Sequence, residues 1–157
     1  MSAPLCPQAH ISLQEEARLL NALTERLTSA LTPLIKRSQA RPFKIAVACS
    51  GGADSMALTE ALLAVTPHLM EQLNVELTPV VLSVSHGLHE RSEEHAQGLK
   101  LYWEGRGVSV LLAQASTALI AAGRGVEEGA RRARYEAFEQ ARRAHQLSLI
   151  LLAHHAD

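Results

Sequence analysis

Ser50-Gly51-Gly52-Ala53-Asp54-Ser55 lies between an apolar run over 43–49 and a helical pattern that begins near Met56. This order predicts a strand, a tight turn and the start of a helix. Two adjacent glycines let the backbone approach a ligand closely and adopt φ values that a Cβ disfavours. The free N–H groups and the dipole of a helix N-terminus favour an anion at such a turn. We therefore interpret the segment as a phosphate-binding loop, with Asp54 placed to cap the helix or to hold a metal.

The loop matches neither of two common nucleotide-binding patterns. It lacks the Gly-Lys-Ser/Thr ending of a Walker A loop, and it lacks the Gly-x-Gly-x-x-Gly spacing of a dinucleotide-binding loop. A plain alternative is a Gly-Gly turn that joins any strand to any helix, since Gly, Asp and Ser are common turn residues. Turn chemistry alone leaves both interpretations open.

Composition and charge narrow the class of protein. The chain has 157 residues, 47% of them hydrophobic, which suits one domain with a core of aliphatic side chains. Its formal net charge of −1 provides no overall basic field for nucleic acid. Cys6 and Cys49 are the only cysteines, so a disulfide framework is not expected. The apolar runs are too short to span a bilayer and residues 1–10 do not resemble a signal peptide, so we expect a cytoplasmic protein without a membrane segment.

Hydrophobic periodicity predicts alternating helices and strands. The expected strands cover 43–49, 79–85, 108–114 and 147–153, and the expected helices cover 13–37, 54–65, 90–106, a short stretch within 115–124, and 126–145. The first helix begins with a capping box from Ser12 and Glu15, and Pro33 predicts a kink or an early end. Thr66-Pro67 is expected to break the second helix. We expect residues 1–40 to form a helical extension that covers the sheet, and 41–157 to form the main domain.

The short, continuous apolar strands favour an α/β fold, with a parallel twisted sheet that carries helices on both faces and resembles a Rossmann fold. In such a sheet, ligands bind beyond the carboxyl ends of the strands, near the switch in strand order. Three polar segments follow predicted strands, namely 50–55, 86–92 and 154–157. The topology therefore predicts that they converge on one edge of the sheet.

Two further positions are candidates for nucleotide contacts. His86 can donate to or accept from a nucleotide base, although a turn with surface histidines is the simpler interpretation. On the helix over 126–145, Arg131 shares a face with Glu127 and Tyr135, so its guanidinium can reach a phosphate. An ion-paired, solvated helix surface is the alternative there.

The chain ends with His154, His155 and Asp157, just after the last predicted strand. These side chains can bind a metal, a carboxylate substrate or an amine. A zinc site, with further ligands from the histidines at 86, 89 and 95, is the main alternative interpretation of these side chains. The spacings match no usual zinc pattern and no cysteine takes part, so a dedicated zinc site is not favoured.

Four motifs in this order resemble the tRNA(Ile)-lysidine synthetase family, which belongs to the PP-loop, or N-type ATP pyrophosphatase, superfamily. They are Ser50 to Ser55, His86-Gly87-Leu88 with Ser92, the helix opening Glu127 to Tyr135, and Ala153 to Asp157. The resemblance covers about 43–157 and implies a fold like that of the adenine nucleotide alpha hydrolases. Ser85, His89 and Glu128-Gly129 depart from the family pattern.

The resemblance implies a ligase that uses ATP to activate the wobble cytidine of an isoleucine tRNA with a CAU anticodon and then attaches free L-lysine. It implies that ATP is held by Ser50, Gly51, Gly52, Ala53, Asp54, Ser55 and His86, and that Asp54 binds Mg²⁺. It further implies that Asp54 and Arg131 are catalytic, with Arg131 stabilising the developing phosphate charge. Glu127, His154, His155 and Asp157 are implied to bind the substrates.

The family pattern continues beyond Asp157, so the chain resembles an N-terminal fragment with an incomplete sheet. We expect tRNA(Ile) to bind through domains that this chain largely lacks. An edge strand left open would favour self-association, so a homodimer is one expected state. Two other functions stay open. One is another PP-loop enzyme, such as a tRNA thiolase or an amide synthetase, although thiolases of this type generally need paired cysteines. The other is a non-catalytic ATP-binding remnant, and for this chain alone we expect ATP binding without turnover.

Overall fold

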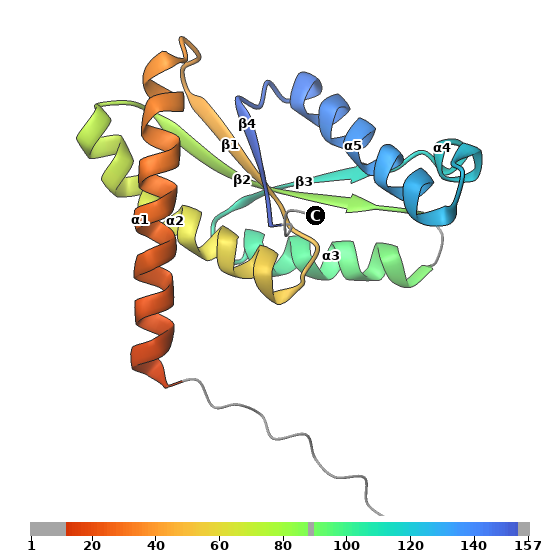
Figure 1. The fold of residues 1–157 in the computed structure, drawn as a ribbon, viewed down its shortest axis with the longest axis horizontal. Coiled ribbons are helices and arrows are strands. Elements are labelled where there is room, and N and C mark those ends of the chain that lie inside the picture. The colour runs from red at the N-terminus through yellow and green to blue at the C-terminus, as the bar shows by residue number, and fades with distance from the viewer. Residues whose placement is uncertain (1–11, 88–89, 154–157) are drawn as a thin grey trace, which may run out of the picture.

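The computed structural model describes residues 12–87 and 90–153 and contains five helices and four strands within them (Figure 1). In chain order they are α1 (Leu13–Arg37), β1 (Phe43–Ala48), α2 (Ala53–Leu73), β2 (Leu77–Ser85), α3 (Glu90–Glu104), β3 (Ser109–Gln114), α4 (Thr117–Ala122), α5 (Val126–Ala144) and β4 (Leu149–Leu152). Every strand and helix predicted from the sequence is present, with shifted ends. None of the described helices is long and apolar enough to cross a membrane.

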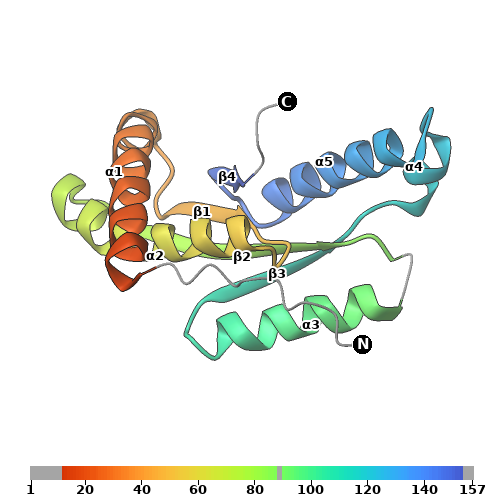
Figure 2. The ribbon, with the colours of Figure 1, turned by 60° about the horizontal axis from the view of Figure 1, so that its bottom comes forward.

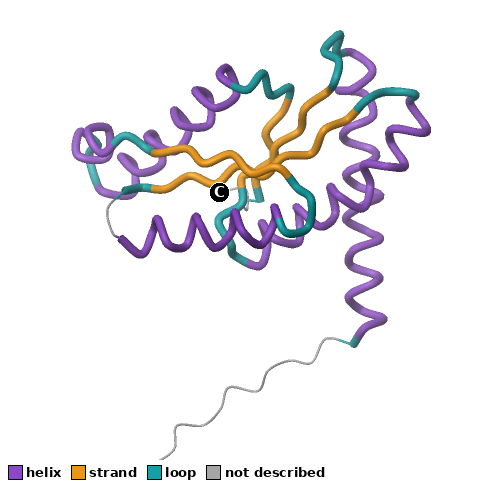
Figure 3. The backbone as a smooth tube through the Cα atoms, turned by 180° about the vertical axis from the view of Figure 1, so that it is seen from behind, coloured by secondary structure: helices purple, strands orange, loops and turns teal. Residues whose placement is uncertain are grey.

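The four strands form one parallel sheet (Figure 3), and their order is β3-β2-β1-β4. Val47 in the centre of β1 pairs with Val81 of β2 on one side and with Leu151 of β4 on the other. The sheet confirms the predicted α/β class. Because β2 and β3 extend the sheet on one side of β1 and β4 returns to the other side, the strand order switches at β1.

Helices cover both faces of the sheet (Figure 2). On one face, α2 and α3 bury Leu62, Leu69 and Trp103 against β1 and β2. On the other face, α5 packs Phe138 and Ala141 against the central strands. Burying these apolar side chains from both sides explains why the strands read as continuous apolar runs rather than as alternating ones.

Helix α1 begins with the predicted capping box, since Ser12 and Glu15 exchange hydrogen bonds of 3.0 and 3.3 Å. Leu27, Leu31 and Ile35 are buried, mainly against α2. The N-terminal part of α1 projects beyond the rest of the domain (Figure 1), and Leu13 is 85% exposed. The helix therefore covers α2 more than the sheet, and the buried side chains of α1 all lie in its second half.

The helix break predicted at Thr66-Pro67 is wrong, because α2 runs through Pro67 to Leu73. Helix α1 ends at Arg37 as predicted for 13–37, so Pro33 does not end it early. Proline removes one helical hydrogen bond. In α2, however, Val65 and Leu69 are buried on either side of Pro67, so tertiary packing holds both halves of the helix in line.

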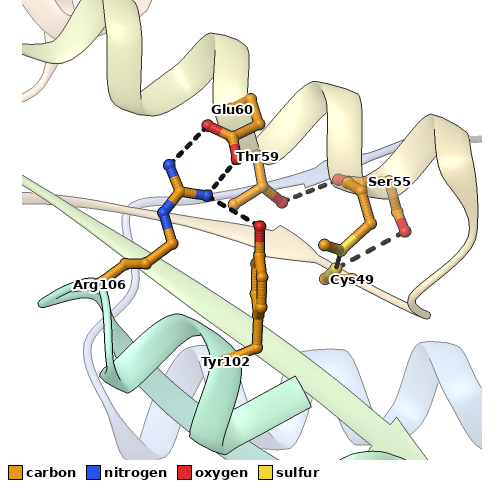
Figure 4. Close-up of polar contacts among 7 residues, drawn as sticks. Cys49, Ser55, Thr59, Glu60, Tyr102 and Arg106 are labelled. Carbon is orange, nitrogen blue, oxygen red and sulfur yellow. Dashed lines mark hydrogen bonds and ion pairs between the residues drawn. The ribbon is translucent and has the colours of Figure 1, made fainter. Parts of the chain in front are cut away.

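Tyr102 of α3 is 49% exposed. It lies beneath the guanidinium of Arg106, which also forms an ion pair with Glu60 of α2 (Figure 4). The Arg106 guanidinium lowers the pKa of the Glu60 carboxyl through their hydrogen bond. This cluster joins the end of α3 to α2.

Candidate functional site

The loop after β1 has the geometry of an anion-binding loop. Gly51 adopts φ +85°, a left-handed conformation that favours glycine. Gly52 is the N-cap of α2 and has no side chain to cap the helix. The first helical hydrogen bond runs from the Met56 N–H to the Gly52 carbonyl, at 3.0 Å. The amides of residues 53–55 therefore precede the helical ladder, where N–H groups are open to an anionic ligand.

The side chain of Ser55 hydrogen-bonds to the backbone of this loop. Its side chain is buried, and its hydroxyl donates to the Gly52 carbonyl at 3.1 Å and accepts from the Ser50 N–H at 3.2 Å. Cys49 Sγ lies 3.6 Å from the same hydroxyl, and Thr59 Oγ1 donates to the Ser55 carbonyl at 2.8 Å (Figure 4). Since a hydroxyl has one hydrogen to donate, the structure uses that of Ser55 within the loop. The contact of Ser55 with ATP that the resemblance implies stays a prediction.

A cavity of about 410 Å³ opens beside the loop, at the carboxyl ends of the strands. Its walls come from segments far apart in the sequence: Ala48, Cys49, Ser50, Gly52, Ala53, Asp54, Ser55, Leu82, Val84, His86, Arg134, Phe138 and Ala153. The cavity lies where the strand order switches at β1. The predicted convergence of the first two polar segments is thus present, and the cavity has the size of a small-molecule site.

Three ionisable side chains line this cavity: the imidazole of His86, the guanidinium of Arg134 and the carboxylate of Asp54. The Nδ1 atom of His86 is buried and has no hydrogen-bond partner among the described residues. Burial of the ring, and secondarily the positive charge of Arg134, lowers the pKa of His86 below its ordinary value of 6.5. The lowered pKa favours a neutral imidazole at pH 7, in which one ring nitrogen donates a hydrogen bond and the other accepts one.

The lowered pKa of His86 predicts how stability depends on pH. As the pH falls through about 6.5, the unfolded chain takes up this proton more readily than the folded chain. The His86 contribution to stability is thus present above about pH 6.5 and is lost as the pH falls below that value. We expect His86→Gln to lose less free energy of unfolding than the parent chain as the pH is lowered through this range, as measured by urea denaturation. An identical loss in both proteins would contradict this environment for His86.

The structure does not bring every predicted site residue to the cavity. Arg131 and Glu127 are exposed on α5, and neither is among the described residues that line the cavity. The guanidinium of Arg131 lies 5.8 Å from the centre of the Tyr135 ring. His154, His155 and Asp157 lie outside the described residues, so their predicted roles are untested. Within the described part of the chain, no three His, Cys, Asp or Glu side chains gather as a metal site.

Two residues of this region escaped the sequence reasoning. Arg134, three residues after Arg131, is the arginine that lines the cavity, together with Phe138 one helical turn later. The i, i+4 spacing of these two residues was the available signal. His95 of α3 lies 2.7 Å, through Nε2, from the Ser50 carbonyl oxygen, and it was considered only as a zinc ligand. No sequence pattern points to a contact between residues 45 positions apart.

Comparison with known proteins identifies the family to which this fold and loop belong. Residues 21–157 match the family described as the PP-loop domain. The chain belongs to the PP-loop family. The match covers the loop, the sheet and all the described walls of the cavity, and it begins within α1.

Among curated PP-loop relatives, the chain is 37% identical over 112 residues to the tRNA(Ile)-lysidine synthase of Deinococcus deserti. The alignment covers 70% of this chain and 19% of that protein. It is 38% identical over 113 residues to the tRNA(Ile)-lysidine synthase of Streptomyces coelicolor, which covers 72% of this chain and 30% of the relative. The chain thus spans about a fifth to a third of the length of these relatives.

A solved PP-loop structure has the same fold. The U34-tRNA thiolase NcsA from Methanococcus maripaludis, with its [4Fe-4S] cluster, superimposes with a TM-score of 0.61 over 98% of this chain and 55% of the thiolase. The sequences are 14% identical, so the likeness concerns the fold alone.

Proposed function

We propose that this PP-loop domain binds ATP and serves as the adenylating part of a tRNA(Ile)-lysidine synthetase. The observation that carries the proposal is the cavity beside the Ser50–Ser55 loop, where open helix amides, a neutral His86 and the cationic Arg134 meet. Amides and a guanidinium suit the phosphates of a nucleotide, whereas a neutral imidazole suits its base. The curated relatives supply the choice of reaction.

The residues present also suit Mg²⁺. Asp54 is exposed, lines the cavity and stands in the first turn of α2 beside the loop. Magnesium is commonly held by one or two carboxylates together with phosphate oxygens and water. We propose that Asp54 supplies this carboxylate. The bound ion offsets the charge that develops on the phosphates.

In the proposed reaction, the C2 oxygen of the wobble cytidine attacks the α-phosphorus of ATP, and the bond to pyrophosphate breaks. The amine of free lysine then attacks C2, AMP leaves with that oxygen, and the amine loses a proton. We propose that Arg134 and the loop amides stabilise phosphate charge in the first step, since Arg134 and the loop residues line the same cavity. Arg131, Glu127, His154, His155 and Asp157 remain predicted contributors to phosphate stabilisation and substrate binding.

The test is transfer of labelled lysine to an isoleucine tRNA transcript with a CAU anticodon, with Mg²⁺ and ATP, by the product of the complete reading frame. We expect label in the tRNA that depends on ATP and is lost in Asp54→Ala, while the far-UV circular dichroism of the variant stays unchanged. ATP binding without label would identify a nucleotide-binding remnant. Full activity in Asp54→Ala would exclude the proposed role of that carboxylate.

Thiolation is less well supported as a second function. A [4Fe-4S] cluster is commonly held by four cysteine thiolates. These 157 residues contain two cysteines, of which Cys49 is buried against Ser55 and Met56. Nothing in the described site therefore favours thiolation over adenylation followed by amine transfer.

A further inference from the structure

His95 of α3 contacts the phosphate-binding loop from outside the cavity. Its Nε2 atom lies 2.7 Å from the carbonyl oxygen of Ser50. A carbonyl oxygen only accepts hydrogen bonds, so Nε2 carries the hydrogen and donates it. His95 is not among the described residues that line the cavity, whereas Ser50 and Gly52 are. The histidine therefore contacts the loop from outside the described cavity.

The loop and His95 fit each other closely. A Cβ on Gly51 would lie 2.6 Å from His95 Nε2 and 2.8 Å from its Cε1, so the absence of a side chain at 51 leaves room for the imidazole. The backbone of His95 is held in turn by Ala96, Leu99 and Trp103, which are buried on the inner face of α3. Although the ring is exposed, it is thus presented from a fixed helix.

The hydrogen bond has a geometric consequence for the neighbouring amide. In a trans peptide the carbonyl of one residue and the N–H of the next point in opposite directions. Holding the Ser50 carbonyl toward α3 therefore turns the Gly51 N–H away from His95. We propose that His95 is a positioning residue, which orients the Ser50–Gly51 peptide so that its N–H is available to the phosphates of ATP. This inference rests on the proposed ATP binding.

The test measures Mg·ATP affinity by calorimetry on four variants of the full chain, three at His95 and one control. His95→Ala removes the donor and is expected to raise the Kd about 3- to 10-fold, the range expected for one net hydrogen bond. His95→Gln keeps an N–H donor and should restore the affinity to within about 2-fold. His95→Glu has the length of Gln but only accepts, and it should weaken binding at least as much as alanine. Gln97→Ala, an exposed change on the same helix, should leave the Kd unchanged.

A second readout separates positioning from general stability. Nitrogen-15 NMR of the nucleotide-free chain should show His95 as the Nε2–H tautomer, and the Gly51 amide resonance should shift in His95→Ala but return in His95→Gln. A Kd in His95→Ala equal to that of the parent chain would overturn the inference, as would a glutamine variant as weak as alanine. If the parent chain binds no adenine nucleotide, the proposed function fails, while the tautomer and the Gly51 shift still decide whether His95 orients the loop.

Discussion

Replacing Gly129 by alanine is expected to lower the free energy of unfolding by about 2–3 kcal/mol, the cost of forcing an atom into a closely packed interior. A Cβ at this position would lie 2.3 Å from the Ile120 carbonyl oxygen and 2.9 Å from its Cα. Both are backbone atoms of α4, so a side chain rotation cannot relieve the overlap. Urea denaturation followed by circular dichroism measures the change.

Gly98→Ala is the matched control for this stability prediction. Gly98 is exposed within α3, and an added Cβ there would meet no atom within 4 Å. Alanine in a helix interior is more favourable than glycine by about 0.5–1 kcal/mol, so this variant should be more stable than the parent chain. If Gly129→Ala matched the stability of the parent chain, the close α4–α5 contact would be contradicted.

Arg134→Ala is expected to weaken Mg·ATP binding about 10- to 100-fold. The guanidinium lines the cavity, and its positive charge already contributes to the lowered pKa of His86. Hydrogen bonds to charged groups contribute about 1.5–3 kcal/mol each, which corresponds to this loss of affinity. Isothermal titration calorimetry on the folded variant measures the effect.

Arg131→Ala is the internal comparison for Arg134, because it removes the same side chain three residues earlier on the same helix. Arg131 is exposed and lies over Tyr135, so we expect its loss to change the Kd for ATP by no more than about 3-fold, as for an exposed charge. Its predicted role concerns the phosphate charge that develops during the reaction, which the Kd does not report. If Arg131→Ala weakened binding more than Arg134→Ala, the phosphate contact would belong to Arg131, as the sequence first indicated.

The fold was largely predictable because its elements obey simple periodicities. Four short apolar runs separated by helical patterns predict a parallel sheet, and the position of Gly51-Gly52 after the first run places the loop at the ligand-binding edge. Proline was misleading at Pro67, since burial of Leu62 and Leu69 outweighs one lost helical hydrogen bond. Such tertiary compensation is not visible in a local window.

The details of the site were harder to predict because they depend on how helices are rotated and placed. Whether Arg131 or Arg134 faces the cavity is decided by the face that buries Ala133 and Ala137 on α5, and several arginines share that helix. The His95 contact joins α3 to the loop across 45 residues, and only the assembled fold brings these two segments together.

The central claim is that main-chain amides of the Ser50–Ser55 loop bind the phosphates of ATP. Titrating the nitrogen-15-labelled chain with Mg·ATP, and separately with adenosine, tests it most directly. The account predicts that amide resonances of residues 51–55 shift with ATP and stay in place with adenosine, which lacks the phosphates. Loop amides that do not respond to ATP, in a chain whose spectrum shows it to be folded, would contradict the account.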